Sequence, residues 1–238
     1  MSHLYPVGIQ SFEEVRKGNY CYVDKTALIY QLVKTNKYYF LSRPRRFGKS
    51  LLISTLEAYF LGKKELFNGL ALEELEKDWI TYPVLHLDLN TQKYNTPEAL
   101  TNVLEENLKN WEDLYGASDR EIGVARRFNG VIRRAAEKTG RNVVILVDEY
   151  DKPMLQAIGN EELLSEYRST LKAFYGVLKS CDPYIRFALL TGVTKFSKVS
   201  VFSDLNNLMD ISMSNRFANT VVLRNRNYIQ NSKKTSLR

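Results

Sequence analysis

The sequence predicts an α/β fold, a three-layer sandwich in which helices cover both faces of a mainly parallel sheet. Apolar strand-like segments alternate with helical segments along the 238 residues, which is the pattern of strands joined by crossover helices. The segment Asn142 to Val147 is apolar without alternation, as expected for a parallel strand that is covered on both faces. A chain of this length can bury most of its apolar surface in one core.

Four strands and four long helices are expected in order. Aromatic and β-branched runs predict strands over residues 37–42, 82–89, 142–147 and 184–190. Helical spacing of apolar residues predicts helices over 49–60, 96–111, 119–138 and 161–179. Thr96 and Pro97 suit a helix start, with threonine as the cap, and Gly140 suits a helix end.

The turn between the first strand and the helix 49–60 carries most of a phosphate-binding motif. Its residues are Arg43, Pro44, Arg45, Arg46, Phe47, Gly48, Lys49 and Ser50, followed by Leu51. The pattern G-x-x-x-x-G-K-[ST], or Walker A, is matched except at its first glycine, where Arg43 stands. Backbone N–H groups at a helix start attract an anion, Lys49 can reach the β- and γ-phosphates, and Ser50 can bind Mg²⁺. The sequence therefore predicts an ATP-binding loop over 43–51; a Gly-Lys-Ser tripeptide that merely starts a helix is the alternative.

Two carboxylates, Asp148 and Glu149, follow the apolar strand 142–147 in the manner of a Walker B motif. A strand-end aspartate can hold Mg²⁺, and a glutamate next to it can orient and deprotonate a water. The alternative is that both residues simply end the strand. Glu149, together with the extra strand 82–89 between the two motifs, favours the P-loop NTPase branch that hydrolyses ATP with a catalytic glutamate. No Asn-Lys-x-Asp stretch for guanine occurs.

A polar residue at the end of the fourth strand is expected between the two motifs. Thr191 is the candidate, as a residue that senses the γ-phosphate and assists Lys49 and Glu149 in catalysis. Lys195 and Lys198 are weaker candidates for the same loop. Arg186 and Arg216 are open candidates for an arginine finger.

Together these motifs resemble an AAA-ATPase-like family of bacterial and archaeal proteins, which usually carries a C-terminal PD-(D/E)XK nuclease-like domain. The resemblance is carried by Tyr22-Val23-Asp24-Lys25-Thr26, the Arg-Pro-Arg-Arg-Phe-Gly-Lys-Ser loop, Leu146-Val147-Asp148-Glu149-Tyr150-Asp151-Lys152-Pro153, and the stretches from Leu190 to Ser197 and from Ser203 to Leu208. That loop form is specific to the family, which accounts for the missing glycine.

The resemblance implies ATP binding by Gly48, Lys49 and Ser50, and magnesium and hydrolysis roles for Asp148 and Glu149. Asp24 and Lys25 either line the nucleotide pocket or stabilise the start of the first helix. We expect an ATPase domain over residues 1–218 and a basic, disordered or aberrant tail over 219–238, since the tail does not match the family's continuation and looks truncated or frameshifted.

Composition bounds the partners. The net charge is +7, but five basic and no acidic residues in the tail leave +2 for the rest, so nucleic acid is a secondary partner after ATP. Whether the protein forms a homo-oligomer is left open by the sequence. The sequence has no apolar run long enough to cross a bilayer and no signal peptide. It therefore predicts a cytoplasmic protein with no membrane partner. Three functions follow in order: an ATP-hydrolysing motor or switch, a nucleotide-binding module with little turnover, and a nucleic-acid-binding protein.

Overall fold

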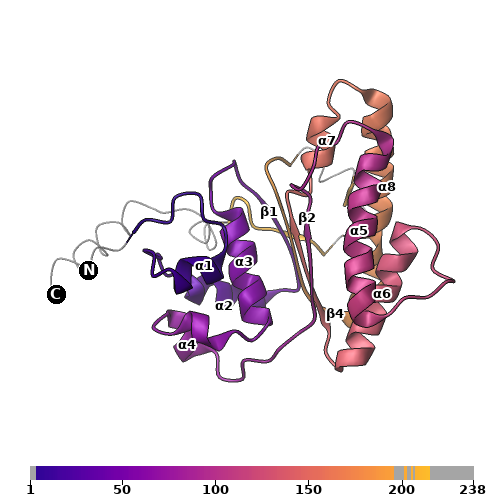
Figure 1. The fold of residues 1–238 in the computed structure, drawn as a ribbon. Coiled ribbons are helices and arrows are strands. Elements are labelled where there is room, and N and C mark those ends of the chain that lie inside the picture. Colours follow the sequence, from indigo (N-terminus) through magenta and orange to yellow (C-terminus); the bar gives the residue numbers. More distant parts are fainter. Residues whose placement is uncertain (1–3, 196–200, 203–204, 206, 215–238) are drawn as a thin grey trace.

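A computed structural model describes residues 4–195, 201–202, 205 and 207–214, and every structural statement below concerns these residues. Three layers are visible in Figure 1: a central sheet with helices α1–α4 on one face and helices α5–α8 on the other. The predicted α/β sandwich is therefore confirmed. The tail predicted over 219–238 lies outside the described residues.

The helices and strands alternate along the chain as the sequence pattern indicates. The strands are β1 (Tyr38–Ser42), β2 (Val84–Asp88), β3 (Val143–Asp148), β4 (Ile185–Gly192) and β5 (Met209–Asp210). The α-helices are α1 (Phe12–Lys17), α2 (Thr26–Thr35), α3 (Lys49–Phe60), α4 (Ala71–Leu75), α5 (Pro97–Tyr115), α6 (Val124–Thr139), α7 (Lys152–Gln156) and α8 (Glu161–Ser180). Two 3-10 turns, Lys64–Phe67 and Asp182–Tyr184, complete the described elements.

All five strands of the sheet run parallel, in the order β2-β3-β4-β1-β5. Strand β4 therefore lies between β1, which leads into the phosphate loop, and β3, which leads into the acidic pair. Strand β2, expected as the extra strand of this ATPase branch, lies at the edge of the sheet beside β3. Strand β4 has the position between the two motifs that is expected for the strand ending at Thr191. Because parallel strands end at the same edge, the ends of these three strands face one region of space.

Side chains alternate between the two faces of the sheet, and each face has its own core. On β3, Val144 and Leu146 pack with α2 and α3, whereas Val143, Ile145 and Val147 pack with α5, α6 and α8. The same alternation directs the next residue, Asp148, toward the α3 side. The sheet thus aims the strand-end carboxylate at the helix that follows the phosphate loop.

Differences from the expected elements are local and have physical causes. Helix α6 begins at Val124 rather than Asp119, because residues 116–123 form a loop that Glu121 ties to the helix by a bidentate ion pair with Arg134. Pro97 occupies the first turn of α5 as expected, but Thr96 makes no side-chain capping bond. Gly140 ends α6 in the left-handed conformation, as predicted.

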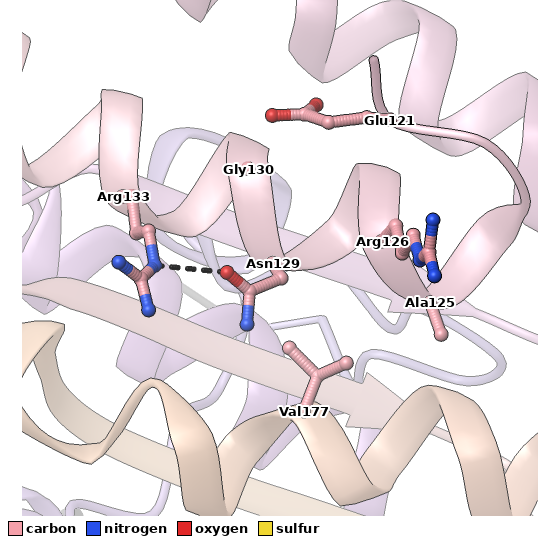
Figure 2. Close-up of a pocket in the computed structure, with 7 residues that line it drawn as sticks. All are labelled: Glu121, Ala125, Arg126, Asn129, Gly130, Arg133 and Val177. Atoms are coloured by element: carbon pink, nitrogen blue, oxygen red, sulfur yellow. Dashed lines mark hydrogen bonds between the residues drawn. The ribbon is translucent and has the colours of Figure 1, made fainter.

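The α6–α8 layer holds an open pocket of about 440 Å³, on the opposite side of the sheet from α3. In Figure 2, Asn129 of α6 points toward Val177 of α8 and accepts a hydrogen bond from Arg133, and Glu121 lies above Gly130. A Cβ at position 130 would overlap the Glu121 carboxylate. The glycine inside this helix is therefore explained by the Glu121–Arg134 pair that lies against it.

Two helix-interior glycines give a matched test of this explanation. Replacing Gly176 of α8, where an added Cβ meets nothing within 4 Å, by alanine should raise the free energy of unfolding by about 0.5–1 kcal/mol. Gly130→Ala should give no such gain, since the new methyl displaces Glu121 from Arg134. Urea denaturation of both variants measures the difference; equal stabilisation by both would show that the Glu121 contact does not constrain α6.

Candidate functional site

The loop between β1 and α3, in which the phosphate-binding motif lies, makes a tight turn with left-handed backbone at two residues. Gly48, at the N-cap of α3, has φ 78°, and Arg46 has φ 66° although it is not a glycine. Left-handed backbone at a non-glycine residue costs of the order of 1 kcal/mol or more and is concentrated at functional sites. The residues from Pro44 to Gly48 are exposed at the edge of the sheet, where a ligand can reach them.

Lys49 is held inside the loop rather than extended into solvent. Its side chain is 4% exposed, and Nζ lies 3.1 Å from the carbonyl oxygen of Arg43 and 3.4 Å from that of Pro44. The third partner is the carboxylate of Glu149, with 3.3 Å between Nζ and Oε1. The fold thus brings together the lysine of the first motif and the glutamate of the second, 100 residues apart in the sequence.

Asp148 is a buried carboxylate at the end of β3, 4% exposed. Its Oδ1 accepts hydrogen bonds from the Thr191 hydroxyl at 2.5 Å and from the Glu149 N–H at 3.0 Å. Val147 pairs with Leu190 in the sheet, so Asp148 and Thr191 are the next residues of adjacent strands. The predicted position of Thr191 between the motifs is where the structure places it, fully buried.

Glu149 has a strained backbone and a perturbed carboxyl group. Its φ is 54°, outside the regions that a side-chain-bearing residue prefers. Burial raises the pKa of Glu149 and the neighbouring Asp148 charge adds to this, whereas Lys49 opposes it. A carboxyl group with a raised pKa, next to an ammonium at the mouth of an anion cradle, is suited to proton transfer.

A second group of charged side chains borders Asp148 on β2. Asp88 is the register partner of Asp148, and burial raises the pKa of Asp88, to which the charge of Asp148 contributes. Two residues earlier, His86 lies with Nδ1 3.1 Å from Glu57 of α3. His86 therefore belongs to an ion-pairing contact between the sheet and α3, in addition to its predicted place in a strand.

The residues present fit a nucleotide phosphate and a divalent ion. Nε of Arg43 is buried without a hydrogen-bond partner among the described residues, which suits an incoming anion. Within the same part of the chain, the Ser50 hydroxyl and Oδ2 of Asp148 make no hydrogen bond, so both are free to ligate. Hard oxygen ligands of this kind suit Mg²⁺, which takes its remaining ligands from phosphate and water.

Other predicted residues lie elsewhere. Lys195 pairs with Asp210 of β5 at 3.0 Å. Arg186 lies near the opposite end of β4, against the Val33 carbonyl oxygen and the ring of Tyr82, and within one chain it does not face the phosphate loop. Lys198 and Arg216 lie outside the described residues.

Of the two roles considered for Asp24, stabilisation of a helix start accounts for its contacts. Its carboxylate accepts hydrogen bonds from the backbone and hydroxyl of Thr26 and from the N–H of Ala71, tying α2 to α4. Lys25 has no ion pair among the described residues, and burial lowers its pKa to about 8.

Asp151 is the residue at this edge whose role the sequence does not reveal. It is fully buried and accepts hydrogen bonds from the backbone of Val193 and from the backbone and hydroxyl of Thr194. The only sequence signal is its place in the Asp-Glu-Tyr-Asp stretch, because its partners lie more than 40 residues away.

Fold and site together define a P-loop NTPase-like protein. A family model described as "Predicted AAA-ATPase" matches residues 6–202, so the chain belongs to this AAA-ATPase-like family, and the resemblance stated from the motifs is confirmed. One curated relative, "Uncharacterized protein in vnfD 5'region" of Azotobacter chroococcum mcd 1, is 43% identical over 215 residues. The match covers 90% of this chain and 42% of that relative, so the chain spans less than half of the relative's length. No solved structure shows a significant match.

Membership in a family of predicted ATPases supports nucleotide binding, whereas the printed name of the relative assigns it no activity. Among the described residues, no helix combines the length and apolar character that crossing a membrane requires.

The buried hydrogen bond between Thr191 and Asp148 should contribute measurably to stability. Thr191→Val keeps the shape and removes the donor, which should lower the free energy of unfolding by about 1–3 kcal/mol because a buried carboxylate loses a partner. Thr35→Val, which removes an exposed hydroxyl bonded to the Gln31 carbonyl oxygen, is the control and should change it by less than about 0.5 kcal/mol. Equal effects in urea denaturation would contradict the assignment.

His86 should titrate above its ordinary pKa of 6.5. Burial opposes the imidazolium, but the hydrogen bond and charge of Glu57, with Asp88 and Asp148 nearby, outweigh it and raise the pKa of His86. The folded state therefore binds the proton more tightly than the unfolded state. This stabilisation is complete below pH 6.5 and is lost as the pH rises through the folded pKa.

The chain has two histidines, so an NMR titration can follow His86 directly. Glu57→Gln should lower its pKa and flatten the decline in stability with rising pH. A His86 pKa at or below 6.5 in the unmodified protein would contradict the ion-pair assignment.

Proposed function

We propose that this protein binds ATP with Mg²⁺ and hydrolyses the bond between its β- and γ-phosphates, as a motor or a switch. The observation that carries the proposal is the contact between buried Lys49 and Glu149, at 3.3 Å, across the mouth of the loop with left-handed Gly48. A lysine at a helix start that faces a strand-end glutamate is the arrangement in which a phosphate chain and its attacking water can share one site.

Each residue has a distinct role in this proposal. The backbone N–H groups of the loop and the start of α3 bind the phosphates, and Lys49 binds the β- and γ-oxygens. Ser50 and Asp148 hold the metal ion, which would offset negative charge on the phosphate oxygens. Glu149 orients the water and takes its proton, and Thr191 fixes the Asp148 carboxylate from the neighbouring strand.

The Lys49–Glu149 ion pair links the binding of ATP to the release of the Glu149 carboxylate. Lys49 has to exchange its carbonyl partners, Arg43 and Pro44, for phosphate oxygens, and this weakens its hold on Glu149. The carboxylate then becomes available to the water at the same moment as the phosphate arrives. Nucleotide binding and readiness for hydrolysis are coupled through one ammonium group.

A nucleotide-binding module with little turnover is the second candidate. The observation that favours it is the engagement of Glu149 with Lys49, which would keep the carboxylate away from water if the pair persisted in the complex. Single-turnover hydrolysis separates the two candidates, because only the ATPase converts bound ATP to ADP. Self-association, nucleic-acid binding and a cytoplasmic location stay predictions of the sequence.

Mg-ATP should stabilise the folded protein through this site. Ligand at 100 times its Kd adds about 2.7 kcal/mol to the free energy of unfolding, or roughly 5–10 °C in Tm for a domain of this size. Lys49→Ala should abolish the shift. Glu149→Gln should keep it and abolish turnover, because Glu149 acts on the water and not on the bound phosphates. Thermal melts and phosphate release measure the two effects.

Lys109→Ala is the matched control, since Lys109 is an exposed lysine of α5 and should keep both the shift and turnover. An unchanged Tm at millimolar Mg-ATP would overturn nucleotide binding. Normal hydrolysis by Glu149→Gln would leave binding intact and overturn the role given to Glu149.

A further inference from the structure

The loop after β4 is held from one side by the residues that follow the acidic pair. Asp151, fully buried, accepts from the N–H of Val193 at 3.1 Å, from the N–H of Thr194 at 2.7 Å and from the Thr194 hydroxyl at 2.8 Å. Tyr150 adds its hydroxyl, 2.9 Å from the Thr194 carbonyl oxygen. Its own N–H donates to the Thr191 carbonyl oxygen at 2.9 Å.

The same loop is held from the other side by the start of the phosphate loop. The N–H of Arg43 donates to the carbonyl oxygen of Gly192 at 3.1 Å, and the Ser42 hydroxyl donates to that of Val193 at 3.0 Å. Residues 192–194 are therefore a bridge with hydrogen bonds to the start of the phosphate loop and to the two residues that follow the acidic pair. Lys49 lies six residues along the chain from Arg43, and Glu149 lies two residues before Asp151.

The contact leaves no space between the bridge and the acidic turn. A Cβ on Gly192 would overlap the ring of Tyr150 and Oδ1 of Asp151. Because these groups are closely packed, a displacement of Asp151 also moves the residues 192–194 that contact it.

Glu149 lies between two anchored carboxylates. Asp148 on one side is fixed by Thr191, and Asp151 on the other side is fixed by residues 193 and 194. The left-handed backbone of Glu149 persists only where the surroundings hold it. Release of one anchor lets the turn relax and moves the carboxylate relative to Lys49.

We infer that Asp151 is a positioning residue, which holds Glu149 in place and couples the acidic turn to the phosphate loop through residues 192–194. The inference rests on the proposed function. The Asp151 carboxylate is occupied by hydrogen bonds to the bridge, so its removal should affect the chemical step more than nucleotide binding.

The test is the effect of Asp151→Asn on kcat and on Kd for Mg-ATP. The amide retains one acceptor oxygen and presents donors to backbone N–H groups, so the bridge loosens. We expect kcat to fall by about tenfold or more while Kd changes by less than about threefold. Asp182→Asn is the control: its carboxylate accepts hydrogen bonds from the side chains of Lys37 and Tyr38, but before the start of β4. It should lower Tm without changing kcat.

Thr194→Val provides a milder variant that removes one of the hydrogen bonds to Asp151, in case Asp151→Asn fails to fold. We expect it to lower kcat by a smaller factor, about two- to fivefold, with Kd unchanged. Unchanged kcat in a folded variant of either residue, or a loss of kcat matched by an equal rise in Kd, overturns the positioning role.

These outcomes are separable from failure of the proposed function. If Lys49→Ala abolishes binding and Glu149→Gln abolishes turnover while Asp151→Asn hydrolyses normally, the proposed ATPase stands and the positioning role falls. If the unmodified protein binds no Mg-ATP or hydrolyses none, both the proposed ATPase function and the positioning role of Asp151 are wrong.

Discussion

The hydrogen bond from Thr191 to Asp148 joins the ends of two parallel strands, and the arrangement of the site depends on it. The register that places Val147 beside Leu190 makes the next two residues neighbours, and their side chains are 2.5 Å apart. Because β4 lies between β1 and β3, the phosphate loop and the acidic turn stand on either side of Thr191. One fully buried hydroxyl thus fixes the carboxylate that is proposed to bind the metal.

Backbone strain lies at the edge of the sheet where the strands end, and the stabilising apolar cores lie on its two faces. Arg46, Gly48 and Glu149 have left-handed backbone and follow the ends of β1 and β3. The cost is offset by the two apolar cores on the faces of the sheet, which bury the alternating side chains of every long strand. A rigid sheet of this kind can hold a buried lysine and a buried carboxylate in unfavourable surroundings, which is the condition for a reactive site.

Much of the fold was predictable because the long elements obey simple patterns. Helix α3 was expected over 49–60 and is Lys49–Phe60, since apolar spacing and the glycine before it act together. The unbroken apolar run of β3 indicated a strand with both faces covered, and the family is confirmed over residues 6–202. Strand β5, with two residues, is too short for a sequence period and is defined by its pairing with β1.

The site was predictable where chemistry follows local order, and not where it depends on distant contacts. The Gly-Lys-Ser and Asp-Glu stretches are visible in the sequence, and their roles stay proposals. Three features arise only when separate segments of the chain meet: the ion pair of Lys49 with Glu149, the pairing of His86 with Glu57 and the burial of Asp151. Sequence order alone does not say which charged groups will become neighbours.

Calorimetric titration of the unmodified protein with ATP tests the central claim most directly, namely that the two motifs form one nucleotide site. With Mg²⁺ present, we predict saturable binding with one nucleotide per chain. With a chelator in place of Mg²⁺, binding should be weaker, because Ser50 and Asp148 then have no ion through which to hold the phosphates. No heat of binding at millimolar Mg-ATP, with the protein shown to be folded, would contradict the account.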